Sequence, residues 1–101
     1  MKLIAALALL LVSTFCAAAP ETLMTHSRVR FMAANCAYCH GPDGKSRGSI
    51  PSLAGMDKDY FVSRMKAFRD GTRPNTIMST HASGYTNAEF AALGAWFATH
   101  K

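Results

Sequence analysis

Apolar residues recur at intervals of three or four in three separate stretches of the chain, as they do on one face of an α-helix. The first stretch covers about residues 27–36 and has arginines on its other faces. Its repeating positions are Val29, Met32, Ala33 and Cys36. We expect a helix here, and we expect Phe31 to be the large side chain through which it meets another helix.

The second stretch has both of its ends marked in the sequence. Asp57 is a suitable N-cap and Gly71 is a typical stop, so a helix is predicted from about residue 58 to about Asp70. One face of this helix is apolar, which predicts that it packs against the core. The residues of that face are Phe61, Met65 and Phe68.

The third stretch opens with Thr86 and Glu89, which have the spacing of a capping box, and it runs to about residue 99. Several alanines raise its helix propensity and allow close packing. Its apolar face consists of Phe90, Leu93, Trp96 and Phe97. We expect Trp96 and Phe97 to lie in the core, where this helix would cross the first one near Phe31.

Residues 41–55 and 72–85 have no apolar periodicity and are predicted to be loops. The first begins with the dense turn signal Gly41-Pro42-Asp43-Gly44. A loop of this length in a small domain usually has a functional reason, such as lying against a ligand. We therefore expect one all-α domain with three main helices and long loops.

The first residues resemble an export signal. Lys2 precedes an apolar run that is too short for a membrane span, and small residues follow it. Residues 1–19 are predicted to be a signal peptide cleaved after Ala18 or Ala19, which leaves residues 20–101 as one periplasmic domain without a membrane span. Cys16 would be lost with the signal.

The full chain has a net charge of +5, and without Lys2 ten of its eleven Lys and Arg residues remain against six Asp and Glu. These positive charges are scattered rather than gathered in an arginine-rich arm, which argues against nucleic acid. Steering toward an acidic redox partner and an ordinary solvated surface are both consistent with this pattern.

The most specific motif is Cys36-Ala37-Tyr38-Cys39-His40. At this spacing two thiols can add across the vinyl groups of a haem while the adjacent imidazole reaches the iron. We interpret Cys36 and Cys39 as the covalent anchors of one haem c, and His40 as an axial iron ligand. A chain of about 82 residues after cleavage is also small enough to need a cofactor as part of its core.

Other uses of two closely spaced cysteines fit less well. A structural zinc site needs four protein ligands, and there is no second pair. A thioredoxin-like pair would follow a strand, and no strand pattern precedes Cys36. A disulfide between Cys36 and Cys39 would leave His40 without a role.

Two further residues have candidate roles at the haem. The carbonyl of Pro51 can accept the Nδ1 proton of His40 and so orient that ligand, although a proline here can also serve only to shape the turn. Met78, a methionine in a polar loop far from the motif, is the leading candidate for the second axial ligand, and His81 is its rival. A thioether would raise the reduction potential, whereas a second imidazole would lower it.

These features together resemble a small class I c-type cytochrome. Residues 50–55, 59–60, 65–78 and 84–86 are more specifically similar to the cytochrome subunit of flavocytochrome c sulfide dehydrogenase. The resemblance implies a class I cytochrome c fold around one covalent haem c, with axial ligands at His40 and Met78. It also implies an FAD-containing flavoprotein partner that oxidises sulfide, together with other redox carriers downstream. Some members of that family carry two haem domains, and this chain has one motif.

The predicted activity is outer-sphere electron transfer, because ligands at both axial positions leave the iron no site for bond-making chemistry. No paired carboxylates or Ser-His-Asp set appears that would argue for hydrolysis. Arg73, Tyr85 and Asn75 flank the ligand loop and are candidates for holding a haem propionate. A free soluble electron shuttle is the main alternative. A haem sensor or peroxidase with an open sixth site and a haem-free thiol or metal module are the others.

Overall fold

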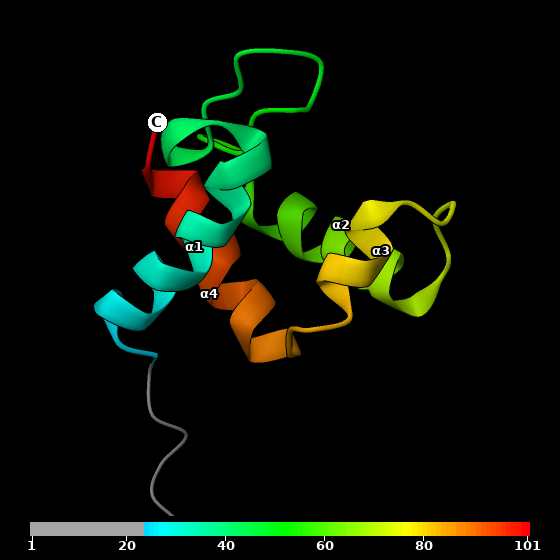
Figure 1. The fold of residues 1–101 in the computed structure, drawn as a ribbon. Coiled ribbons are helices and arrows are strands. Elements are labelled where there is room, and N and C mark those ends of the chain that lie inside the picture. The colour runs from blue at the N-terminus through cyan, green and yellow to red at the C-terminus, as the bar shows by residue number, and fades with distance from the viewer. Residues whose placement is uncertain (1–23) are drawn as a thin grey trace, which may run out of the picture.

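The computed structural model describes residues 24–101, and the predicted signal peptide lies outside them (Figure 1). This part of the chain contains helices and no strand. In chain order the elements are α1 (His26–His40), the 3₁₀ turn η1 (Pro42–Gly44), α2 (Lys58–Asp70), α3 (Ile77–Ala82) and α4 (Asn87–Thr99). The predicted all-α fold is confirmed.

The predicted caps of α2 and α4 are present. Asp57 Oδ2 accepts a hydrogen bond from Tyr60 N at 2.9 Å, and Gly71 ends α2 in the left-handed conformation that a glycine adopts without strain. Thr86 Oγ1 accepts from Glu89 N at 3.2 Å at the start of α4. Both helices therefore have the boundaries that the sequence predicts.

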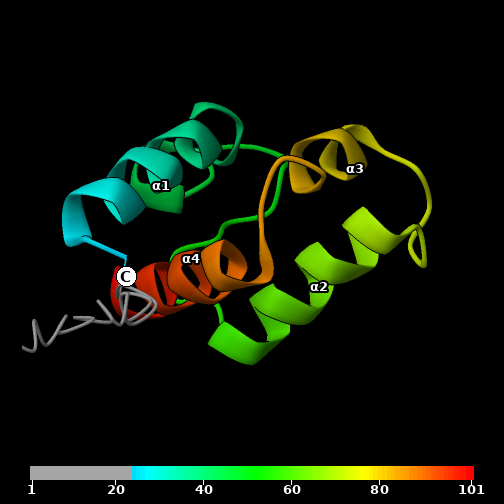
Figure 2. The same cartoon turned by 90° about the horizontal axis from the view of Figure 1, so that it is seen from below.

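Helices α4 and α2 pack closely, and α4 also contacts α1 while α2 contacts α3 (Figure 2). Phe90, Leu93 and Phe97 of α4 are fully buried, and the rings of Phe61 and Phe97 lie 5.8 Å apart. Gly94 permits the close approach, because a Cβ there would lie 3.1 Å from the carbonyl oxygen of Lys58. Helices α1 and α3 share no such contact and stand on opposite sides of a gap.

The predicted position of Phe31 is wrong. Its side chain is 77% exposed, whereas Val29 and Ala33, two residues before and after it, are buried. Two residues along an α-helix correspond to a rotation of about 200°, so Phe31 points away from the side that packs against α4. Trp96 is only half-buried and stacks on His100, with ring centroids 3.8 Å apart, while Phe97 occupies the core as predicted.

The structure contains two helical segments that the sequence analysis does not predict. Helix α1 continues beyond residue 36 to His40, so the whole Cys-x-x-Cys-His motif is helical. Residues 77–82 form the short helix α3 within a stretch predicted to be irregular. Thr76 caps α3, since its Oγ1 accepts from Met78 N at 3.1 Å and its N–H donates to Ser79 Oγ at 3.3 Å. Six residues are too few to show a helical repeat.

The loop after α1 turns sharply at Gly41, where φ is +90° and ψ is 165°. A Cβ at this position would lie 2.0 Å from the carbonyl oxygen of Lys45. We expect Gly41→Ala to destabilise the folded holoprotein by about 3 kcal/mol, because the backbone strain and the clash add together. Urea unfolding measures this loss.

Gly48→Ala in the same loop is the matched control. Gly48 has no atom within 4 Å of a Cβ and does not adopt a positive φ. Its effect is expected to stay within about 0.5 kcal/mol. Equal stability of the two variants would contradict the role of Gly41 in the turn.

Candidate haem site

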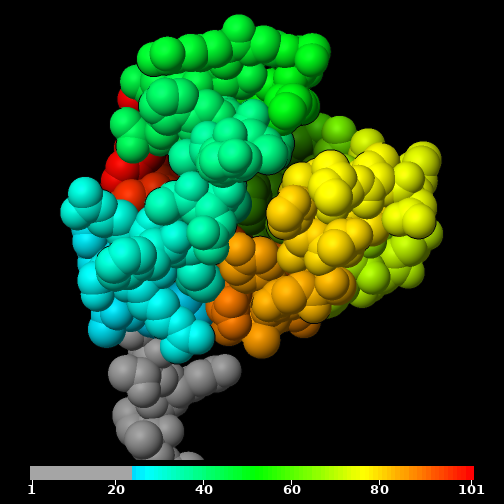
Figure 3. All heavy atoms as spheres, viewed as in Figure 1, coloured from blue at the N-terminus to red at the C-terminus, as the bar shows by residue number. Residues whose placement is uncertain are grey.

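The gap between α1 and α3 is a cavity of about 490 Å³ that opens to the surface (Figure 3). Its walls come from the end of α1, the loop around residues 50–56, one face of α2 and the inner side of α3. This volume is in the range of cavities that hold small-molecule ligands and cofactors. The three parts of the chain that carry the predicted haem ligands, anchors and Pro51 therefore meet at one place, with α2 as a further wall.

Cys36 and Cys39 lie on the last turns of α1 and line this cavity. Cys36 is half-buried, Cys39 is exposed, and neither is in a disulfide. Burial raises the pKa of the Cys36 thiol to about 11, so this thiol is protonated at neutral pH. A thiol-redox pair depends instead on a nucleophilic cysteine with a lowered pKa, so the environment of Cys36 does not favour that alternative.

His40 is buried at the end of α1, and its Nδ1 lies 2.6 Å from the carbonyl oxygen of Pro51. A carbonyl only accepts hydrogen bonds, so Nδ1 carries the proton and Nε2 is the nitrogen with a free lone pair. Of the two roles considered for Pro51, the structure therefore shows the hydrogen bond to His40. The loop is held in place nearby, because Gly44 O accepts from both Leu53 N and Ala54 N. This arrangement suits a metal-binding imidazole whose other nitrogen is fixed by a carbonyl.

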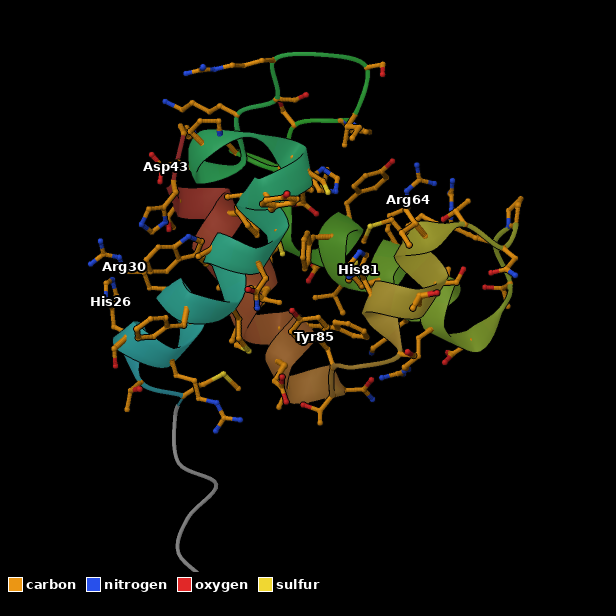
Figure 4. All side chains as sticks on the ribbon, in the orientation of Figure 1. His26, Arg30, Asp43, Arg64, His81 and Tyr85 are labelled. Atoms are coloured by element: carbon orange, nitrogen blue, oxygen red, sulfur yellow. The ribbon has the colours of Figure 1, made fainter. Side chains whose placement is uncertain are left out.

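Helix α3 brings Met78 and His81 to the opposite wall of the cavity (Figure 4). Met78 is half-buried and packs against the core, whereas His81 is exposed. Met56 and Met65 also line the cavity, so position in the cavity does not by itself single out Met78 among the methionines. Three thioethers and one imidazole thus share the cavity with His40.

Of the three residues considered for a propionate, Arg73 and Tyr85 line the cavity and Asn75 does not. The guanidinium of Arg73 lies 5.0 Å from the centre of the Phe68 ring, and its Nε is buried without a hydrogen-bond partner in the described residues. A buried donor without a partner is costly, so Arg73 suits an anionic group in the cavity. No Asp or Glu is among the described residues that line it.

Tyr60 and Arg64 also line the cavity and were missed by the sequence analysis. They lie one turn apart on α2, and the Arg64 guanidinium stands 5.0 Å from the centre of the Tyr60 ring. Arg64 lies on the same side of the helix as Phe61 and Phe68, with which it shares a spacing of three or four residues. That spacing was the available signal, but an arginine beside an apolar face is more often simply exposed.

The family described as Cytochrome c matches residues 29–101, which is most of the chain and includes the whole cavity. The chain is a class I c-type cytochrome. A covalently bound haem c and a role as electron carrier or non-catalytic haem subunit follow from this membership. The cavity fits the cofactor, since it places the two thiols, the buried imidazole and an arginine whose Nε has no hydrogen-bond partner in the described residues around one apolar space.

Several characterised proteins are similar to this cytochrome. The cytochrome subunit of sulfide dehydrogenase from Chlorobaculum tepidum is 38% identical over 74 residues, which cover 73% of this chain and 67% of the relative. A thiosulfate dehydrogenase electron acceptor from Thiomonas intermedia is 34% identical over 68% of this chain and 33% of its own length. Cytochrome c4 from Pseudomonas aeruginosa is 34% identical over 68% of this chain and 35% of its own length. The cytochrome thus spans about a third of the latter two.

Within residues 24–101, none of the helices has the length and apolar character that crossing a membrane requires.

Proposed function

We propose that this cytochrome accepts electrons from the FAD-containing subunit of a sulfide dehydrogenase in the periplasm and passes them to other redox carriers. The observation that carries this proposal is the similarity to the sulfide dehydrogenase cytochrome subunit over two thirds of that relative. The pattern of residues 1–19 supports export and cleavage near Ala18 or Ala19. Residues 20–101 would then be the working domain.

In this proposal Cys36 and Cys39 would hold the haem by thioether bonds, and His40 and Met78 would bind its iron. When bound, haem c supplies a reversible one-electron couple whose potential depends on those ligands. Pro51 O keeps the proton on Nδ1 of His40, which leaves Nε2 for the metal. Arg73 offers a positive charge to a propionate. The walls of the cavity are mainly apolar, which suits a porphyrin.

The test is to mix the oxidised cytochrome anaerobically with sulfide and the flavoprotein subunit from the same organism. Oxidation of sulfide to the level of sulfur releases two electrons, and each cytochrome chain accepts one. Two equivalents of cytochrome are therefore expected to be reduced per sulfide at a rate that saturates with flavoprotein. The rise of the ferrous absorption bands measures this reduction.

The control is sulfide without the flavoprotein, which measures how fast sulfide reduces the cytochrome directly. If the cytochrome is reduced by the flavoprotein no faster than by sulfide alone, the proposed partner is wrong. The similarity to cytochrome c4 then favours the second candidate, a free electron shuttle between other redox proteins. Rapid carbon monoxide binding to the ferrous protein would instead favour a sensor or peroxidase with an open sixth site.

A further inference from the structure

The two most exposed large apolar side chains among the described residues lie on one face of α1. Phe31 is 77% exposed and Tyr38 is 94% exposed. They are seven residues apart, which is about two helical turns and about 10.5 Å along the axis. Ala34 is also exposed and lies between them on the same face. We call Phe31, Ala34 and Tyr38 the α1 stripe.

The surroundings of the stripe are positive. Helix α1 contains Arg28 and Arg30, both exposed, and no Asp or Glu. Beside Phe31 is a hollow in the surface that His26, Ser27 and Arg30 also line, and Figure 4 shows His26 and Arg30 on this outer side of the helix. Exposed aromatic rings next to arginine are the residue types enriched at protein–protein interfaces.

The stripe reaches the haem site. Tyr38 lies between Cys36 and Cys39 in the chain and lines the mouth of the cavity, whereas Phe31 lies outside it. A protein that covers the stripe would therefore contact Tyr38 at the edge of the cavity, between the two cysteines in the chain. The side chain of Phe31 points away from α4, so packing in the core of the described residues gives no reason for a large apolar ring at this position.

We propose that the α1 stripe is the docking surface for the electron-donating dehydrogenase subunit, and that the partner presents an apolar surface edged by carboxylates. This proposal rests on the proposed function and adds the surface on which the two proteins meet. Charge complementarity carries the choice of partner, since α1 offers cations and no anion. A second copy of this chain is a poorer occupant, because two α1 stripes facing each other would bring the arginines of both helices into one interface with no Asp or Glu of α1 to pair with them.

The experiment compares holoprotein variants as electron acceptors of the flavoprotein subunit in the presence of sulfide. Arg30→Glu combined with Phe31→Ala is expected to lower kcat/KM for the cytochrome about tenfold, mainly through KM, and to weaken the dependence of the rate on salt. Arg47→Glu is the matched charge reversal, at an exposed position in the loop after η1, and is expected to change the rate less than twofold. Phe31→Tyr keeps the ring and should retain the rate.

Two further measurements separate docking from damage. Each variant should match the wild type in its reduction by dithionite and in its absorption spectrum, because none of the substituted residues lines the cavity. If the wild type is reduced by the flavoprotein and the double variant is reduced equally well, the docking surface is wrong and the proposed function stands. If the wild type is not reduced, the proposed function fails and the docking proposal with it. A wild-type dimer in sedimentation velocity that Phe31→Ala converts to monomer would show that a second copy occupies the stripe.

Discussion

Replacing Met78 with alanine is expected to remove the far-red absorption band of the ferric protein and to lower the reduction potential by about 0.2 V. If Met78 binds the iron as proposed, this band comes from an iron–sulfur bond and is lost with the thioether. The potential falls because the thioether favours the ferrous state, and axial ligands set haem potentials over a range of about 0.8 V. Absorption spectra in both oxidation states and a spectroelectrochemical titration measure the two effects.

The cavity itself provides the controls for this prediction. Met65 also lines it, and Met65→Leu nearly conserves volume, so this variant should keep both the band and the potential. His81→Ala removes the rival imidazole from α3 and should likewise keep the band. Survival of the band in Met78→Ala would show that another methionine is the ligand, and Met56 would be the next to replace. A wild-type protein without the band would favour His81.

The caps made the starts of α2 and α4 predictable from the sequence. The side of α1 that packs against α4 was not predictable in this way. Asp57 and Thr86 act within three residues of themselves, so the sequence alone was enough to place the starts of α2 and α4. The position of Phe31 depends on which side of α1 meets α4, which is a property of the whole fold. An exposed aromatic ring in an apolar helix cannot be recognised from its own neighbours in the chain.

The residues of the candidate site also differ in how far the sequence alone predicts them. The common position of Cys36, Cys39 and His40 at the cavity was predictable, because their spacing in the sequence keeps them together at the end of one helix. The bond between His40 and Pro51 joins residues eleven apart, and the sequence left its role open until the loop geometry was known. Tyr60 and Arg64 line the cavity because α2 turns that face toward α1 and α3, and the spacing of Arg64 from Phe61 and Phe68 does not by itself distinguish a cavity wall from an exposed flank.

The largest effect on the cofactor is expected from replacing both anchors, as Cys36→Ser with Cys39→Ser. Without thioether bonds the haem should be extractable by acid–acetone, and the haem stain on a denaturing gel should vanish. The fold is affected too. Without the haem, the apolar side chains that line the cavity of about 490 Å³ lose their packing partner and face water. A chain of this size has little other apolar core to replace that burial.

The helical content of the double variant should therefore depend on the concentration of added haem, as expected when a ligand binds only the folded chain. Circular dichroism during a haem titration measures this dependence. The single variants Cys36→Ser and Cys39→Ser are the matched controls, because one remaining thioether should keep the haem through acid–acetone treatment and keep the helices independent of added haem. Haem that resists extraction from the double variant would mean that another group anchors it. Helical content that is unchanged without haem would mean that the helices around the cavity stabilise one another without the cofactor.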